Sequence, residues 1–248
     1  MSDEKLKALE EEVEQLTHRL GVLQDIDEIR KLQHKYGYYF DSCLYEEVVE
    51  LFAEDGEVHF MGGIYRGKES VARLYLDRLR NRFTGGKDGI VYGLLYEHIQ
   101  FQDVITVMPD RKTAKGRYRG FMQAGFHESS GREPKQWWEG GIYENVYVKE
   151  DGVWKFKVLN YRGWWHADFE TGWAYTPPNL YPFYTKTKAE DPDNPHAPDD
   201  LVTDPKPFLW PETNVIPFHY PHPVTGKWWQ GEEEVKRWKN DSNNWRKK

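Results

Sequence analysis

The stretch IRKLQHKYGYYFDSCLYEEVVELFAEDGEVHF, residues 29–60, decides the fold of this chain. Its first part has the apolar spacing of an amphipathic helix, and an aromatic run from Tyr36 to Phe40 ends there in a single acid, Asp41. A second helix is expected to reach a turn at residues 51–56, and a short alternating strand follows from Glu57 to Phe60. The pattern therefore predicts two helices leading into a strand, with Asp41 buried near the end of the first helix.

The next hundred residues have the pattern of one helix followed by four long strands. The helix is expected from Gly67 to about Gly85 and carries Arg78 on its apolar stripe. This arginine either extends its stem to solvent or faces a polar site inside the protein. Strands are expected at about 91–107, 113–126, 137–149 and 153–165, the last two joined by an Asp-Gly hairpin turn. A meander of long strands after helices predicts an α+β fold with a strongly curved antiparallel sheet.

Both ends of the chain differ from this central part. Leucine and valine residues between Leu6 and Leu23 are spaced three and four residues apart, which is the seam of a coiled coil. Helices this short are marginal alone in water, so residues 1–24 are expected to pack on their own domain or on a partner subunit, and we favour the partner subunit. Beyond Asp168 many prolines interrupt regular structure while aromatic residues remain frequent. We expect a domain at 25–167 and an ordered arm at 168–248 that packs on the domain or on a neighbouring subunit.

Composition excludes several classes of function. The net charge is -7 with a pI near 5.8, so there is no basic surface for nucleic acid. A mean hydropathy of -0.87 without a long apolar run excludes a transmembrane helix, and the acidic start lacks a secretory signal, so we expect a cytoplasmic protein. The single cysteine, Cys43, excludes an internal disulfide and a thiolate-rich metal site. Aromatic residues make up 16% of the chain, and they fill either core and subunit contacts or a pocket for an aromatic ligand.

Asp41 and His98 are the leading candidates for chemistry. A buried carboxylate needs a partner, and an Asp–His pair fixes the imidazole tautomer and raises its basicity for general-base catalysis. The alternatives are a helix cap for Asp41 and a core histidine for His98. No phosphate-binding loop, nucleophile elbow or set of residues with metal-ligand spacing is visible. The residues therefore favour acid–base chemistry with no metal and no cofactor.

Residues 25–165 resemble the SnoaL-like branch of the NTF2-like superfamily, which includes scytalone dehydratase, bile-acid dehydratase and polyketide cyclases. The resemblance rests on the aromatic run ending at Asp41, the following LFAEDGEVHF segment and His98 in LLYEHIQF. It implies a cone-shaped barrel, a curved sheet closed by helices, in which Asp41 and His98 form the acid–base machinery. It also implies a homotrimer or another closed oligomer, as in several relatives.

The match to scytalone dehydratase is partial. That enzyme's second pocket histidine and its pocket asparagine fall near Tyr118 and Tyr143, so we add these two tyrosines to the catalytic candidates. A pocket rich in phenols and guanidinium groups is suited to holding an oxyanion or a phenolate. The residues expected to bind the substrate are Tyr36, Tyr39, Phe40, Phe60, Arg78, Arg119 and Trp165.

The chain is also similar to members of the superfamily that process lignin-derived diarylpropanes, through its N-terminal helix and its arm with a YPHPVTGK segment. This similarity implies a lyase that converts a phenolic 1,2-diarylpropane-1,3-diol into a stilbene and formaldehyde through a quinone methide. The alternatives are a dehydratase or isomerase of an aromatic, steroid or polyketide-like substrate, and a non-catalytic NTF2-like binding module. In the last case Asp41 and His98 do not touch, or the protein's own side chains fill the pocket.

Overall fold

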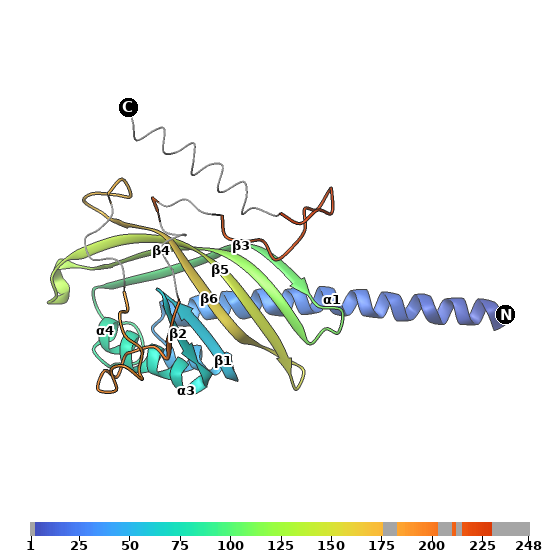
Figure 1. Cartoon of the computed structure of the whole chain (residues 1–248), viewed down its shortest axis with the longest axis horizontal. Coiled ribbons are helices and arrows are strands. Elements are labelled where there is room, and N and C mark those ends of the chain that lie inside the picture. The colour runs from blue at the N-terminus through green and yellow to red at the C-terminus, as the bar shows by residue number, and fades with distance from the viewer. Residues whose placement is uncertain (1–2, 176–182, 203–209, 212–214, 230–248) are drawn as a thin grey trace, which may run out of the picture.

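The computed structural model describes residues 3–175, 183–202, 210–211 and 215–229. A strongly curved sheet wraps around one end of a long helix, and shorter helices lie below it (Figure 1). The helical elements are α1 (Asp3–Asp41), α2 (Tyr45–Glu50), α3 (Gly67–Ala72), the π-helix η1 (Arg73–Leu79), α4 (Arg80–Thr84) and the 3-10 helix η2 (Glu128–Ser130). The strands are β1 (Phe52–Phe60), β2 (Gly63–Arg66), β3 (Leu94–Val107), β4 (Thr113–Phe126), β5 (Lys135–Glu150), β6 (Val153–Asp168) and β7 (Asp200–Leu201). The α+β class, the helix near 67–85 and the four long strands are confirmed.

The sheet has the order β3-β4-β5-β6-β1-β2-β7. Strands β3 to β6 form the expected antiparallel meander, but β1 runs parallel to β6, so the sheet is mixed. The expected curved antiparallel sheet is thus extended by one parallel pairing, between β1 and β6. Strand β1 follows α1 and α2 but precedes α3 to α4, and it joins the meander beside its last strand, which requires a long connection rather than a hairpin. The ends of the sheet do not pair, so it is curved but not closed.

The segment at residues 53–56 is not the expected turn. Strand β1 begins at Phe52, and its partner on β6 changes from Phe156 opposite Phe52 to Val158 opposite Glu57. More residues on β1 than on β6 separate these two pairs, as in a β-bulge. Gly56 lies there so close to its neighbours that an added Cβ would be 2.9 Å from the carbonyl oxygen of Ala53. The Glu-Asp-Gly signal thus marks a bend within a strand.

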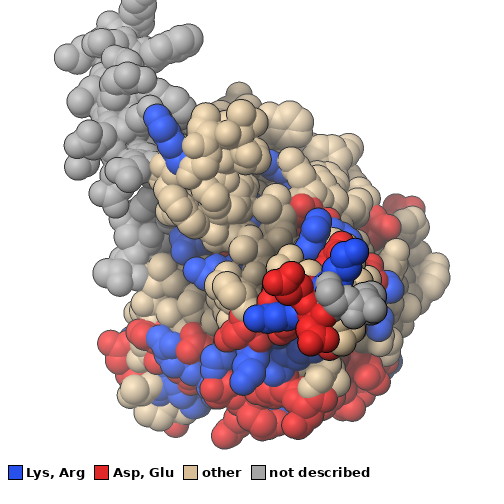
Figure 2. Space-filling model, turned by 90° about the vertical axis from the view of Figure 1, so that its right-hand side faces the viewer, with Lys and Arg blue, Asp and Glu red and all other residues tan. Residues whose placement is uncertain are grey.

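Helix α1 has two different halves. Residues 3–20 are exposed along their whole length, including the apolar seam from Leu6 to Leu20, and this half projects beyond the sheet (Figure 1). From Gly21 onward one face is buried, and Tyr36 and Phe40 contribute to the core. The helix continues without a break at residue 24. Figure 2, which faces the N-terminal end of α1, shows acidic and basic side chains intermixed over the lower part of that face.

The core is largely aromatic, and glycines in the strands make room for its rings. A Cβ added to Gly141 would lie 2.4 Å from the ring of Tyr161, and one added to Gly120 would lie 2.9 Å from the ring of Tyr143. These tyrosine rings therefore lie flat across neighbouring strands, where a side chain on the glycine would displace them.

The described parts of the C-terminal arm contact the domain. Strand β7 pairs with β2, and the carbonyl oxygens of Ile216 and Pro217 accept hydrogen bonds from Arg117 of β4. The guanidinium group of Arg78 packs against the rings of both Phe183 and Tyr184, 4.7 and 4.6 Å from their centroids. The remainder of the expected ordered arm, at 176–182, 203–209, 212–214 and 230–248, lies outside the described residues. Within the described part of the chain, no helix is long and apolar enough to cross a bilayer.

Candidate active site

Asp41 and His98 are in direct contact. Asp41 is the last residue of α1, and its Oδ1 accepts a hydrogen bond from the His98 backbone N–H at 2.7 Å. The same oxygen lies 2.9 Å from His98 Nδ1. Because a carboxylate only accepts, Nδ1 carries the proton in this contact, and Nε2 of the neutral ring has the free lone pair. The His98 ring is held by Phe40 and Tyr96, with centroids at 4.4 and 4.5 Å. This arrangement is that of an oriented general base.

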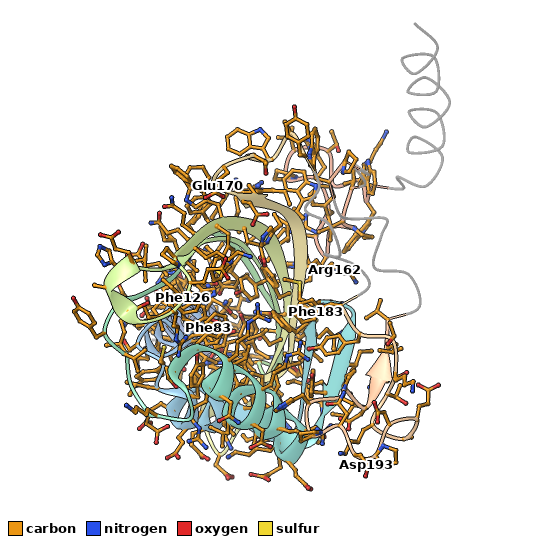
Figure 3. The ribbon with its side chains drawn as sticks, turned by 90° about the vertical axis from the view of Figure 1, so that its left-hand side faces the viewer. Phe83, Phe126, Arg162, Glu170, Phe183 and Asp193 are labelled. Carbon is orange, nitrogen blue, oxygen red and sulfur yellow. The ribbon has the colours of Figure 1, made fainter. Side chains whose placement is uncertain are left out.

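His98 lines a cavity of about 450 Å³ between the curved sheet and the helices. This volume is in the range of small-molecule sites, about 300–1,000 Å³. Figure 3 shows Phe83 of α4, Phe126 of β4 and Phe183 of the arm around the space between the sheet and the helices. The aromatic residues of the lining are Tyr36, Phe40, Phe60, Tyr75, Phe83, Tyr96, Phe126, Trp137, Tyr143, Tyr161 and Phe183. A ligand there would contact mainly ring faces and edges.

The buried phenols of the cavity favour their neutral form. Burial raises the pKa of Tyr36 and of Tyr143 well above the usual value for tyrosine. The hydroxyl oxygens of Tyr36 and Tyr75 are 3.0 Å apart, and Gln100 Nε2 lies 3.5 Å from the hydroxyl of Tyr143. Neutral phenols keep their protons, so these tyrosines can donate hydrogen bonds to a charged oxygen on a ligand.

A second group of polar residues lies in the same cavity. Glu139 of β5 is 5% exposed, and its Oε1 accepts a hydrogen bond from the Tyr161 hydroxyl at 2.7 Å. Its other oxygen lies 3.4 Å from Nδ1 of His166, whose Nε2 is 3.8 Å from Asp168. None of these residues was expected at the site: His166 and Asp168 lie beyond the expected end of the last strand at residue 165, and Glu139 was within an expected strand without a partner to mark it. Trp137 and Glu139 alternate along one strand, and His166 and Asp168 continue the same alternation on the next strand. Extending that next strand past residue 165 could have found them.

Of the other residues expected at the site, some line the cavity and some do not. Tyr36, Phe40, Phe60, Arg78 and Tyr143 line the cavity together with His98. Tyr39, Tyr118, Arg119 and Trp165 are outside its lining.

Each of these four has a structural reason for its position. Tyr118 is fully buried, and its ring covers Gly116, away from the cavity. Arg119 follows it on β4 and, because strand neighbours alternate, faces the other side, where it bonds to Gln102 and lies over Trp164. Trp165 packs over Gly140. Tyr39 is only half-buried and packs against the edge of the aromatic core.

Metal ligands are not grouped anywhere in the described ranges: no three histidine, cysteine, aspartate or glutamate side chains there could hold an ion together.

Comparison with known proteins identifies the family. The model of the SnoaL-like domain matches residues 10–160, more than half of the chain. The chain belongs to the SnoaL-like domain family. No match was found among curated proteins.

Solved structures show the same NTF2-like fold. The SnoaL-like protein is similar to a hexachlorocyclohexane dehydrochlorinase, LinA-type3 from Novosphingobium barchaimii LL02, with 19% identity and a TM-score of 0.50 over 64% of this chain and 99% of that one. A candidate scytalone dehydratase from Novosphingobium aromaticivorans DSM 12444 has 23% identity and a TM-score of 0.47, covering 60% and 90% of the two chains. An NTF2-like protein from Novosphingobium aromaticivorans has 22% identity and a TM-score of 0.44, covering 59% and 86%.

Proposed function

We propose that this SnoaL-like protein is a cofactor-independent lyase that acts on a phenolic aromatic dimer inside the cavity. The observation that carries the proposal is the contact of Asp41 with His98 Nδ1, which leaves an oriented base in a cavity lined mainly by aromatic rings. A general base needs its partner within hydrogen-bond distance and a substrate within reach, and this geometry supplies the first requirement. The contact and the open cavity both argue against the non-catalytic binding module.

The substrate that suits this cavity best is a lignin-derived 1,2-diarylpropane-1,3-diol. Two aryl rings match the aromatic lining, and a phenolate oxygen matches hydrogen-bond donors such as Tyr36, Tyr143 and Arg78. The phenolate pushes electrons to the benzylic carbon, the benzylic C–O bond breaks, and the oxygen leaves as water after taking up a proton. The product of this step is a quinone methide, which is an electron sink.

His98 completes the reaction in this proposal. Its Nε2 removes the proton of the terminal hydroxyl, the C–C bond breaks, and formaldehyde leaves while the bonding electrons return to the quinone methide ring. The products are a stilbene, formaldehyde and water, so atoms and charge balance. Asp41 stabilises the imidazolium that forms.

A dehydratase or isomerase acting on an acidic C–H is the second candidate, because the same Asp41–His98 pair could remove that proton. The fold shared with a dehydrochlorinase supports it as well.

The two candidates are separated by one assay. Purified protein is incubated with the phenolic diol, formaldehyde is measured colorimetrically, and the stilbene is measured by mass spectrometry. The 4-O-methyl ether of the same diol is the matched substrate, since it has no phenolate to form the quinone methide. We expect turnover of the phenol alone; a methyl ether converted at a comparable rate would favour the C–H acid reaction, and no formaldehyde from either would refute the lyase.

A further inference from the structure

Four residues that line the cavity lie in one row across the sheet. In the strand register His98 is opposite Met122, Met122 is opposite Glu139, and Glu139 is opposite His166. All four belong to the cavity lining. Neighbouring strands are about 4.8 Å apart, so the backbone positions of His98 and Glu139 are about 10 Å apart. The cavity floor therefore carries two groups able to transfer protons, one on each side of Met122.

Glu139, like His98, has hydrogen-bonding partners that orient its side chain. Its two carboxyl oxygens have separate partners, the Tyr161 hydroxyl at 2.7 Å and His166 Nδ1 at 3.4 Å. With 5% exposure, a carboxyl group at this place is stable only when it is paired or protonated. The carboxyl group thus has a fixed orientation on the cavity floor, on the side of Met122 that is away from the Asp41–His98 pair.

Polar groups connect Glu139 with solvent. His166 Nε2 lies 3.8 Å from Asp168, and Asp168 lies 4.0 Å from the ammonium group of Lys135. The side chain of Lys135 is 58% exposed, whereas that of His166 is 14% exposed. The series of charged groups therefore extends from the buried carboxyl group to an exposed ammonium group, and its gaps of 3.8 and 4.0 Å require bridging water for a proton to pass.

The proposed lyase reaction needs such a second group. His98 takes a proton from the terminal hydroxyl, but the benzylic hydroxyl must receive a proton before it can leave as water. A single imidazole held by Asp41 is in the base form at the start of the cycle and has no proton on Nε2 to give. The acid must therefore come from elsewhere in the cavity.

We propose that Glu139, oriented by Tyr161 and His166, is the catalytic acid that protonates the leaving hydroxyl group. This inference rests on the proposed function. A proton first passes from His166 Nδ1 to the carboxylate of Glu139, which makes the acid form. This proton then moves to the benzylic oxygen, the C–O bond breaks with its electron pair on the departing water, and the phenolate supplies electrons to the benzylic carbon. Glu139 is left as a carboxylate and regains a proton through His166 and bridging water. His98 does not take part in this step.

The test separates the two steps by oxygen exchange. Because quinone methide formation is reversible, water labelled with oxygen-18 should enter the benzylic hydroxyl of the recovered phenolic diol. His98→Ala should keep this exchange while formaldehyde release falls at least about 100-fold, the usual scale for a positioned acid or base. Glu139→Gln, which keeps the shape of the side chain, should lose exchange and formaldehyde release together by a similar factor. Glu97→Gln, on the exposed side of β3, is the matched control and should retain both.

The possible outcomes separate the role of Glu139 from the lyase proposal itself. Exchange in Glu139→Gln at the wild-type rate would overturn the role of Glu139 and leave the lyase proposal standing. Exchange without formaldehyde in the wild-type protein would overturn the lyase proposal, while the loss of exchange in Glu139→Gln would still support the acid. Neither exchange nor formaldehyde in the wild-type protein would overturn both. Circular dichroism and thermal melting of each variant show whether a loss comes from unfolding, and Tyr161→Phe, which removes only one partner of Glu139, should lower exchange less than Glu139→Gln does.

Discussion

Replacing Asp25 should test how the buried half of α1 is fixed to the sheet. Asp25 is 1% exposed at its side chain and faces three donors: Arg111 Nε at 2.5 Å, Lys149 Nζ at 2.7 Å and Trp154 Nε1 at 3.1 Å. Burial alone would raise the pKa of this carboxyl group, but hydrogen bonds from the three donors outweigh burial and lower its pKa from 3.8 to about 2. The folded state therefore prefers the charged form of Asp25.

The lowered pKa of Asp25 gives the size of its contribution to stability. A pKa lowered from 3.8 to about 2 corresponds to about 2 kcal/mol of the free energy of unfolding. Because the pKa of the folded state is the lower one, this contribution is fully present above about pH 4 and is lost as the pH falls toward 2. Asp25→Asn should thus destabilise the protein by about 2 kcal/mol at pH 7, and the difference from wild type should shrink below pH 4.

Urea unfolding followed by tryptophan fluorescence, repeated from pH 7 down to pH 2, measures this difference. Asp27→Asn is the matched control: it lies two residues away on the same helix, but its carboxylate is exposed and pairs only with Lys31. We expect the control to unfold like wild type across the pH range. A destabilisation by Asp25→Asn that stays constant down to pH 2 would refute the assignment of the stability to the charged carboxylate.

Three further predictions concern turnover, packing and assembly. Asp41→Asn and His98→Ala should each lower turnover of the identified substrate at least about 100-fold with an unchanged melting curve, and near-full activity in either would exclude the pair as the base. Gly141→Ala should lower the melting temperature, because the new methyl group meets the Tyr161 ring at 2.4 Å; unchanged melting and activity would mean that the ring has space to move. We propose that the exposed seam of α1 joins copies of this chain, with a trimer favoured, so light scattering of the full chain should give a closed oligomer. Deleting residues 1–20 should reduce its mass, and a monomeric full-length protein would contradict the proposal.

The elements that local patterns specify were predicted well. Strands β3 to β6 were expected within a few residues of their bounds, because strict alternation and turn residues mark them. The pairing of β1 with β6 was missed, since periodicity describes one strand at a time and does not give its neighbour. The bulge at Gly56 was taken for a turn because the same glycine and acidic residues mark both.

The candidate site was predicted in part for a similar reason. Asp41 and His98 came from a resemblance, and their contact is present. Tyr118 and Arg119 were both expected at the site although neighbours on a strand face opposite sides, and neither lines the cavity. Whether a side chain on a curved sheet reaches the cavity depends on which strands pair and in what register. Glu139 illustrates this best, since only the pairing of β5 with β4 and β6 places it in a row with His98.

The unbroken course of α1 has a mechanical consequence. A helix of 39 residues is about 58 Å long, and Asp41 lies about 24 Å beyond the pivot at Asp25, where the buried ion pairs fix the rod. A tilt of about 1° at that pivot would move Asp41 by about 0.4 Å. Displacements of this size matter to proton transfer, which depends on sub-ångström alignment. Because α1 is one unbroken helix, a contact made on its projecting half, residues 3–20, acts on the same rod that carries Asp41 at its other end.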